Sequence, residues 1–559
     1  MGSRKRLGEM LMEQNLLQQD ELAKSLALQR ERHEKLGRIL VDLGFVSSRD
    51  VLAALSQQLE IPLVTARDFP AVAPEPDGIS LRFMRQFQFL PVRVEDSEIT
   101  LAMSDPLDFE TISAVRLSTQ LAVKVLLCSE QEILAALERY YPDPETDTPD
   151  PATAEIATQS EEDIEHLRDM ASEVPVIRLV NSLIAHAVER RASDIHLEPL
   201  EKKFRVRYRL DGVLHSVEAP PRSLQSAVLS RVKLMAKLNI AEHRLPQDGR
   251  IQLKILGRDV DLRVSTLPTL HGEGVVMRLL DRSESDRYEL GRLGFSAAMM
   301  ARMEHFSSRP YGIFLVTGPT GSGKSTTLYS ALKRINTLDR KIITIEDPVE
   351  YQMDGINQIH VNTQIGLTFA SGLRHIVRQD PDVIMVGEIR DRETAEIAIR
   401  AALTGHLVFS TLHTNDAPSA ITRLTDMGIE SFLLTSSLVA VLAQRLVRVN
   451  CPECKQEEIV AGDWLRSRGL DAPEGEYRIY RGAGCEACSH TGFRSRVGIF
   501  EMMELNEEIR KMILANSDAG TLARAARAQG MRTLREDGQQ KVAAGITTPE
   551  EILRVTQEF

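Results

Sequence analysis

The sequence predicts a multi-domain α/β protein organised around a glycine-rich loop near the middle of the chain. Residues Gly318 to Thr326 read GPTGSGKST, which satisfies the pattern G-x-x-x-x-G-K-[ST]. A short apolar run at 313–316 precedes this loop, and residues 327–335 follow it with helical spacing of their apolar side chains. Beyond the loop, strand-like runs alternate with helical stretches, which is typical of a largely parallel sheet with helices on both faces.

Length and composition limit the number of domains, the class of protein and its expected location and partners. A chain of 559 residues is too long for one core, so three or four domains are expected. With 43% apolar residues, 26% charged residues and a net charge of −12, the composition is that of an ordinary globular protein. No apolar run is long enough to span a membrane and the N-terminus lacks a signal-peptide core, so we expect a cytoplasmic location. The acidic balance argues against nucleic acid as the main partner.

Residues 1–60 contain an internal repeat with an offset of 29 residues. Arg6-Leu7-Gly8 returns as Lys35-Leu36-Gly37, and further pairs with the same offset are Leu22 and Val51, Leu26 and Leu55, and Gln29 and Gln58. Each copy is typical of a turn followed by a short helix. Two copies are fewer than a solenoid requires, so the repeat predicts a compact helical module with the leucines in its core.

Residues 61–141 predict a small α/β domain without catalytic motifs. Strands are expected at 98–102 and 123–126, and a helix at 130–140, with Cys128 as a buried small hydrophobic residue. Residues 142–173 are expected to form a flexible linker because Pro142 to Glu162 is rich in proline, acids and threonine.

Residues 174–288 predict a half-buried sheet with arginines on one face. Residues 204–210 alternate strictly between apolar residues and Arg205, Arg207 and Arg209, and Asp211-Gly212 follows as a hairpin turn. A second alternation at 260–265 places Arg263 between apolar residues. A solvated charged face accounts for most single arginines. Three on one strand of an acidic protein favour contact with an anion, such as a phosphate bound by a neighbouring subunit.

Residues 289–559 contain the glycine-rich loop, which suits a nucleotide phosphate. Backbone N–H groups would surround the β-phosphate, Lys324 would reach the β- and γ-phosphates and Ser325 would bind Mg²⁺. The nucleotide-contacting residues expected from the sequence are Gly318, Pro319, Thr320, Gly321, Ser322, Gly323, Lys324, Ser325, Thr326, Glu346, Asp347 and His406.

Polar groups follow three predicted strands of this domain. The strand at 342–345 leads to Glu350, the strand at 383–386 leads to Glu388, and the strand at 407–410 lies between His406 and His413. Ligands of open α/β sheets gather at the carboxyl ends of the strands. We therefore expect one glutamate to polarise the attacking water and the other to help hold hydrated Mg²⁺. The histidines are either well-satisfied polar residues or sensors of the γ-phosphate.

Four cysteines form a candidate metal site near the C-terminus. Cys451 and Cys454 form one C-x-x-C pair and Cys485 and Cys488 a second, within an insert at about 448–492. Paired C-x-x-C units suit tetrahedral Zn²⁺ in a structural role, and a cytoplasmic location disfavours disulfides. The residues from 507 onward are expected to be helical.

Four segments resemble the signatures of the secretion ATPase superfamily, in that family's order. They are the glycine-rich loop, IEDPVE as its Asp box, DVIMVGEIRD as its Walker B segment and TGHLVFSTLHTNDA as its His box. The four cysteines and phrases such as AEHRLPQDGR narrow the resemblance to type II secretion and type IV pilus assembly ATPases, with the type II branch favoured. Gly387 departs from the common Walker B pattern because many P-loop enzymes place an Mg²⁺-binding aspartate there.

The resemblance implies a RecA-like ATPase core, preceded by a small PAS-like α/β domain. It also implies Mg²⁺-ATP hydrolysis, a homo-hexamer, and partners in an inner-membrane platform and a membrane-anchored protein with a cytoplasmic domain. By analogy with the family, Arg207, Arg209 and Arg222 would act across the subunit boundary. A type IV pilus extension ATPase, a nucleotide-gated adaptor with little turnover and a DNA-translocating motor are the alternatives.

The N-terminal repeat resembles the tandem motif of cyclic-di-GMP-binding domains found on some of these ATPases. The residues concerned are Arg6, Leu7, Gly8, Gln29, Lys35, Leu36, Gly37 and Gln58. Two departures are Asn15 at the place of Gly44, and Lys35 where that motif has arginine. The alternative is a helical module that docks onto a membrane-anchored partner.

Overall fold

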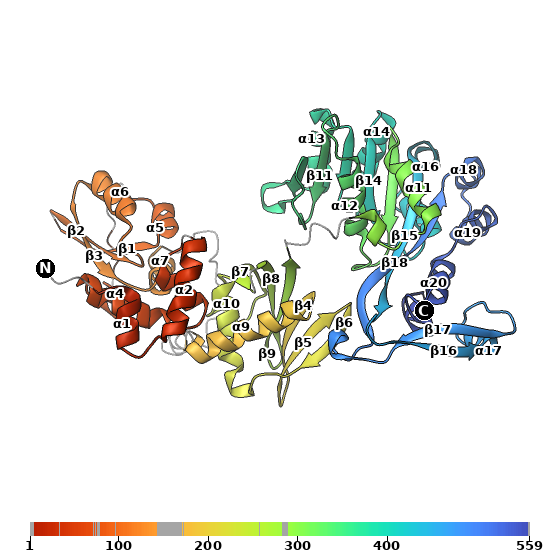
Figure 1. The fold of residues 1–559 in the computed structure, drawn as a ribbon. Coiled ribbons are helices and arrows are strands. Elements are labelled where there is room, and N and C mark those ends of the chain that lie inside the picture. Colours follow the sequence, from red (N-terminus) through yellow and green to blue (C-terminus); the bar gives the residue numbers. More distant parts are fainter. Residues whose placement is uncertain are drawn as a thin grey trace.

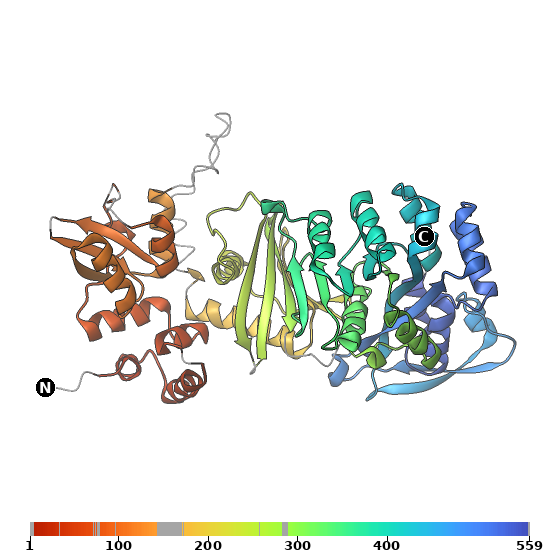
Figure 2. The ribbon, with the colours of Figure 1, turned by 90° about the horizontal axis from the view of Figure 1, so that it is seen from above.

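The computed structural model confirms the predicted α/β architecture and arranges it as a row of units (Figures 1 and 2). The N-terminal elements lie at one end, a six-stranded sheet lies in the middle, and the sheet that carries the glycine-rich loop lies at the other end. The predicted linker at 142–173 falls almost wholly outside the described residues. The structure describes residues 5–32, 34–70, 72, 74, 79–95, 97–141, 170–171, 173–255, 258–281 and 289–556.

The N-terminal module consists of four helices around a small apolar core. The helices are α1 (Leu7–Glu13), α2 (Gln19–Arg32), α3 (Leu36–Asp42) and α4 (Ser48–Leu59). The 29-residue repeat has a packing explanation for its glycines. A Cβ on Gly8 would lie 2.6 Å from Leu22 Cδ1, and a Cβ on Gly37 would lie 2.7 Å from Val51 Cγ1. In each copy the second helix packs directly against the glycine, so a larger residue there would require a side chain of that helix to shift.

The repeated glutamines and the departure at position 15 also have structural explanations. Gln29 Nε2 donates to the Glu34 carbonyl at 3.2 Å, and Gln58 Nε2 donates to the Lys5 carbonyl at 2.8 Å. In each case the acceptor is the residue before the repeated cation. Asn15 and Gly44 have φ angles of 57° and 69°, a left-handed conformation that asparagine tolerates better than most residues. Asn15 therefore preserves the backbone conformation that glycine provides in the other copy.

The repeat predicted Leu26 in the core of the module, but the structure places it at the surface. It is 39% exposed on α2.

The small α/β unit that follows confirms the predicted strands and helix. Its strand order is β1-β2-β3, with β1 and β2 antiparallel and β2 and β3 parallel. Cys128 is fully buried in its core, and burial raises the pKa of the thiol far above its usual value. The elements are η1 (Ala66–Asp68), α5 (Leu81–Phe87), β1 (Phe89–Val94), β2 (Glu98–Met103), α6 (Phe109–Thr119), β3 (Ala122–Leu127) and α7 (Glu130–Tyr140).

The six-stranded sheet is antiparallel throughout, in the order β6-β5-β4-β9-β8-β7. On β5 the four apolar residues are buried and the three arginines between them are half-buried, as the alternation predicted. Two helices, α9 and α10, pack on the apolar face. The elements are α9 (Val174–Glu189), β4 (Asp194–Pro199), β5 (Phe204–Leu210), β6 (Val213–Val217), η2 (Arg222–Leu224), α10 (Gln225–Met235), β7 (Gln247–Ile255), β8 (Arg258–Thr269) and β9 (Gly272–Asp281).

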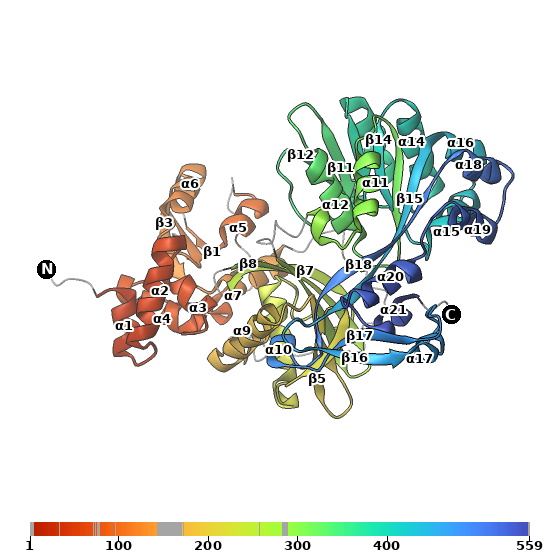
Figure 3. The ribbon, with the colours of Figure 1, turned by 45° about the vertical axis from the view of Figure 1, so that its right-hand side comes forward.

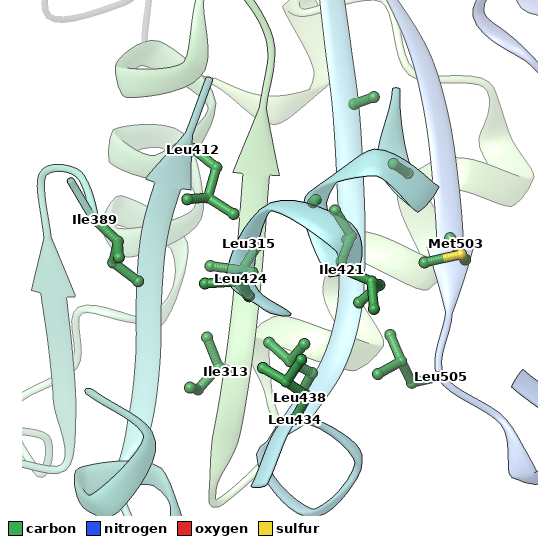
Figure 4. Packing of buried hydrophobic residues seen from close by; sticks show 14 of the residues in the cluster. Ile313, Leu315, Ile389, Leu412, Ile421, Leu424, Leu434, Leu438, Met503 and Leu505 are labelled. Carbon is green, nitrogen blue, oxygen red and sulfur yellow. The ribbon is translucent and has the colours of Figure 1, made fainter. Parts of the chain in front are cut away.

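The sheet of the P-loop domain has seven strands in the order β12-β11-β13-β14-β10-β15-β18. The first six are parallel, and β18 pairs antiparallel with β15 at one edge. Ile313 and Leu315 on β10 face one hydrophobic core, whereas Phe314 and Val316 face another, so both faces of this strand are buried. Figure 4 shows the first of these cores, where Leu424 and Leu434 pack over β10.

The elements of this domain up to β15 are η4 (Leu290–Arg292), α11 (Ala297–Ser307), β10 (Gly312–Thr317), α12 (Lys324–Ile335), β11 (Ile342–Glu346), β12 (Ile356–His360), η5 (Thr363–Ile365), α13 (Phe369–Ile376), η6 (Val377–Gln379), β13 (Val383–Val386), α14 (Arg392–Leu403), β14 (Leu407–Leu412), α15 (Ala417–Asp426), α16 (Ser431–Ser437) and β15 (Leu438–Asn450).

After β15 the chain forms the cysteine-containing insert, returns through β18 and ends in helices near the insert (Figure 3). These elements are β16 (Lys455–Ala461), α17 (Gly462–Arg466), β17 (Glu476–Gly482), η7 (Glu486–Cys488), β18 (Phe493–Glu504), α18 (Glu507–Leu514), α19 (Ala519–Ala528), α20 (Leu534–Ala543) and α21 (Pro549–Thr556). Within the described part of the chain, we find no helix whose length and hydropathy would let it cross a bilayer.

Candidate nucleotide site and cysteine cluster

The glycine-rich loop has the backbone conformation that phosphate binding requires. It leaves β10 after Thr317, and Gly318, Gly321 and Gly323 have φ angles of 147°, 79° and 88°. Only glycine adopts such angles without strain. Gly323 is the N-cap of α12, which begins at Lys324. The unpaired N–H groups at this helix N-terminus therefore face the loop and can bind an anion.

Lys324 is buried at the centre of the loop and is 8% exposed. Its Nζ donates to the carbonyls of Gly318 at 2.7 Å and Pro319 at 3.1 Å. Burial lowers the pKa of the ammonium group to about 8, and the charge of Glu388 partly opposes this shift. Ser322 Oγ is buried and has no hydrogen-bond partner among the described residues. Phosphate oxygens would supply both groups with acceptors, so the residues present fit a bound nucleotide.

Glu388 and His413 meet at the same edge of the sheet. They follow the neighbouring parallel strands β13 and β14, and His413 Nε2 lies 3.1 Å from Glu388 Oε2. Arg390 also forms an ion pair with Glu388. Burial alone would raise the pKa of Glu388, but Arg390 and His413 together hold it below its usual value. The carboxylate is therefore ionised at neutral pH, and its charge acts on Lys324.

Gly387 cannot be replaced by a metal-binding aspartate without moving its neighbours. A Cβ there would lie 3.3 Å from the Ile345 carbonyl oxygen and 3.4 Å from Glu346 Cα, both on β11. A side chain at position 387 would therefore require β11 to shift by a few tenths of an ångström.

Glu350 lies where the six-stranded sheet approaches the P-loop domain. Arg263 Nη1 on β8 is 3.4 Å from Glu350 Oε2, and Arg263 Nη2 donates to the Val349 carbonyl at 3.2 Å. The Glu350 backbone N–H donates to Tyr329 Oη at 3.2 Å, and Tyr329 belongs to the P-loop helix α12. These contacts connect Glu350 to both units.

Glu346 was expected among the nucleotide-contacting residues, but the structure gives its carboxylate other partners. It is 4% exposed and accepts hydrogen bonds from Tyr329, from Thr344 Oγ1 at 2.7 Å and from Gln358 Nε2 at 3.1 Å. Burial raises its pKa in spite of these donors. Glu346 therefore supports the Asp-box segment from within the core.

The expected role of His406 in contacting nucleotide conflicts with its position. It immediately precedes β14, and β14 runs parallel to β10, with Leu407 opposite Gly312 and Leu412 opposite Thr317. His406 thus lies at the amino edge of the sheet, roughly 20 Å from the glycine-rich loop at about 3.3 Å per residue. Its Nδ1 lies 2.8 Å from the Ala401 carbonyl oxygen.

The three arginines expected to act across a subunit boundary have partners within their own unit. Arg207 shares Glu198 with Arg205, and Arg209 Nε lies 3.4 Å from Asp194 Oδ2. Arg222 donates to the Glu201 carbonyl. Each of these side chains therefore has a local carboxylate or carbonyl partner, although Arg207 Nε is buried without a hydrogen-bond partner among the described residues.

A different set of arginines forms a row across the sheet. Arg250 on β7 pairs with Arg263 on β8, which pairs with Arg278 on β9, and Arg278 pairs with Asp194 on β4. Like charges directly opposite one another destabilise a sheet unless anions lie between them. Asp261 and Asp194 flank the row, and Glu350 lies against Arg263. The alternation at 260–265 was the sequence signal for Arg263, but strand pairing was needed to reveal the row.

The four cysteines of the insert converge as predicted. Their Sγ atoms all lie within 4.8 Å of one another, with separations of 3.8 Å for Cys451–Cys485, 3.9 Å for Cys454–Cys488 and 3.7 Å for Cys485–Cys488. A tetrahedral Zn²⁺ with Zn–S bonds of about 2.3 Å places its sulfurs about 3.8 Å apart. Backbone N–H groups of Gly484 and Gly492 also donate to sulfurs at 3.3 Å. The donor set therefore fits a closed structural metal site.

Glu501 on β18 is a buried carboxyl beside the His box. Its Oε1 accepts a hydrogen bond from the Ala417 N–H at 2.9 Å, at the start of α15. Burial raises its pKa to about 7, and the nearby charge of Asp416 adds to this shift. Because the folded-state pKa exceeds that of the unfolded chain, Glu501 lowers stability progressively as the pH rises from about 4.5 to 7.

We expect Glu501→Gln to stabilise the P-loop domain at pH 8 by up to about 3 kcal/mol, since glutamine keeps the acceptor without the charge. The thermal unfolding of the two proteins should be compared at pH 5 and pH 8. The gain in midpoint should be small at pH 5, and a gain independent of pH would contradict the explanation.

Comparisons with known proteins agree with this geometry. The family described as "Type II/IV secretion system protein" matches residues 169–554, and the MshEN domain matches residues 59–147. The chain belongs to the type II/IV secretion system protein family. Over 99% of the chain and 98% of the relative, it is 50% identical to type II secretion system protein E of Xanthomonas campestris.

The chain is also similar to the type IV pilus assembly ATPase PilB of Myxococcus xanthus. It is 43% identical over 98% of each chain. An X-ray structure of the Legionella pneumophila ATPase DotB matches with a TM-score of 0.50 and 22% identity, covering 67% of this chain and 94% of that chain. The DotB match supports the fold.

Proposed function

We propose that this chain is a Mg²⁺-dependent ATPase that works as a hexamer and powers pseudopilus assembly for type II secretion. The observation that carries this proposal is the convergence of a complete phosphate-binding loop, buried Lys324 and the Glu388–His413 pair at one edge of the sheet. The relatives favour the type II role, since the type II protein E is more similar over the full length than PilB. A type IV pilus extension role is the second candidate.

The chemistry assigned to each group follows from its position. Lys324 would leave the Gly318 and Pro319 carbonyls and bind the β- and γ-phosphates. Ser325, the first residue after Lys324, would contribute to the Mg²⁺ site, and the ion would neutralise phosphate charge when bound. Glu388 is ionised and hydrogen-bonded to His413, which suits a base that orients water. Glu350, held beside Arg263, would then support the hydrated metal.

The remaining parts of the proposal concern assembly. The four cysteines would hold Zn²⁺, and the N-terminal units would face the membrane-anchored partner and the inner-membrane platform while the motor stays on the cytoplasmic side. Steady-state ATP hydrolysis by the purified chain, measured with and without DNA, tests the central claim. Turnover that does not respond to DNA is expected. ATP binding without turnover would favour a nucleotide-gated adaptor, and strong stimulation by DNA would favour a DNA motor.

Mixed hexamers test which arginines act within a subunit. Arg263 contacts Glu350 of its own chain, so we expect a mixture of Arg263→Ala and Lys324→Ala subunits to stay inactive. Arg207 lies on β5, the second strand from one edge of the sheet. We expect its alanine variant to regain some activity when mixed with Lys324→Ala subunits, as action across the boundary requires. Native mass spectrometry should verify mixing. Rescue of the Arg263 mixture would contradict its action in cis.

The N-terminal module is proposed to bind cyclic-di-GMP through the repeated cations. Packing and backbone contacts account for its glycines and glutamines, but not for the return of a cation at Arg6 and Lys35. Lys35 forms an ion pair with Asp105, which a phosphate would have to displace. Calorimetry on the full chain should show binding at tens of micromolar, lost in Arg6→Ala/Lys35→Ala and kept in the neighbouring Lys5→Ala control. No heat from the folded wild-type chain would favour partner docking alone.

A further inference from the structure

The buried side chain of Gln444 contacts the glycine-rich loop from the neighbouring strand β15. Gln444 lies on β15, just beyond the point where Ala443 pairs with Thr317 at the end of β10. It is 2% exposed. The parallel strand β15 therefore places the side-chain amide of Gln444 against the loop, where the loop begins at the end of β10.

Both the NH₂ group and the oxygen of the Gln444 side-chain amide form hydrogen bonds. Its Nε2 donates to the Ser322 carbonyl at 2.9 Å, and its Oε1 accepts a hydrogen bond from Thr327 Oγ1 at 2.6 Å. The Ser322 carbonyl can only accept, so the NH₂ group must face it. The amide therefore joins the loop to the first turn of α12 in one fixed orientation.

The same contact explains two of the loop glycines. A Cβ on Gly318 would lie 2.4 Å from the Gln444 carbonyl oxygen, and a Cβ on Gly323 would lie 2.7 Å from Gln444 Nε2. Both distances are far shorter than any van der Waals contact. The loop thus lies directly on the backbone and side chain of Gln444, and its glycines serve this packing as well as their backbone angles.

We propose that Gln444 is a positioning residue that holds the glycine-rich loop in its phosphate-binding conformation. By holding the Ser322 carbonyl toward β15, it keeps that oxygen from turning toward the bound phosphates, where it would repel them. The loop N–H groups then point into the site before the ligand arrives. Preorganised donors of this kind bind an anion without the cost of reorganisation. The inference rests on the proposed function of the loop as a nucleotide site.

The proposal predicts a specific pattern of affinities. A loop of this type surrounds the α- and β-phosphates. Loss of Gln444 should therefore lower the affinities for ADP and ATP by the same factor, and lower the affinity for AMP less. Gln444→Met keeps the length of the side chain and removes both hydrogen bonds. Two hydrogen bonds of ordinary strength correspond to a loss of up to about thirtyfold in ADP affinity. Substitution of a residue that contacts the γ-phosphate would instead lower the affinity for ATP alone.

Fluorescent-nucleotide titration of the full chain tests this, with Asn450→Leu as the matched control. Asn450 is a buried amide on the same strand, and it contacts Tyr480 and Gly545 instead of the loop. The control should bind ADP as the wild type does at a temperature where both are folded. Wild-type ADP affinity in folded Gln444→Met would overturn the inference, whereas failure of the wild-type chain to bind ADP would overturn the proposed function.

A second pair of variants covers the case in which Gln444→Met does not fold. Thr327→Val removes the hydroxyl that fixes the amide, and Thr327→Ser keeps it. We expect ADP affinity to fall several-fold in the valine variant and to stay near wild type in the serine variant. Equal affinities in the two variants would contradict the role of the amide.

Discussion

Alanine at Lys324 is expected to abolish measurable ATP hydrolysis. The ammonium group is buried in the loop, and no other lysine or arginine belongs to the loop itself. Without it, the charge that develops on the transferred phosphoryl group loses the cationic side chain of the loop. Loss of one such preorganised group costs on the order of 10²–10³ in turnover. A phosphate-release assay measures the rate, and nucleotide titration shows whether the loss lies in binding or in the chemical step.

Glutamine at Glu388 should separate binding from hydrolysis. The amide keeps the size of the side chain but cannot accept a proton, so ATP should bind while turnover falls by about 10²–10⁴. Glu350→Gln is the comparison, because the structure places Glu350 beside Arg263. A near-wild-type rate for Glu388→Gln with a large loss for Glu350→Gln would reverse the two roles. Wild-type rates for both variants would refute the assignment.

Removal of the metal is a further change with a large expected effect. The four sulfurs lie close together in the insert, and as thiolates without a cation they would repel one another. We therefore expect a chelator to unfold the segment that contains β16, α17 and β17. Trp464 is the only tryptophan of the chain and lies on α17, so its fluorescence reports on this segment directly.

ADP binding is the internal control for metal removal. The helix α12, which follows the loop, packs in a core that contains no residue of the insert, so nucleotide should still bind when the Trp464 signal changes. Metal analysis of protein purified without chelator should give about one zinc per chain. Far less than one zinc, or unchanged fluorescence after complete metal removal, would refute a structural site.

The sequence by itself determined the features that depend on local pattern. The loop GPTGSGKST, the strict alternation at 204–210 and the two C-x-x-C pairs each encode their geometry within a few residues. Backbone periodicity and fixed ligand spacing are local properties, so the strands, the helix after the loop and the cysteine cluster lie where they were expected.

Tertiary structure decided everything that depends on strand order. Parallel pairing put His406 at the far edge of the sheet and His413 beside Glu388, although both flank the same strand. Pairing of β7, β8 and β9 turned single arginines into a row and placed Arg263 against Glu350. Gln444 lies 122 residues after Ser322, and only the adjacency of β15 and β10 brings its amide under the loop. Contacts of this kind arise from long-range packing, which leaves no periodic signal in the chain.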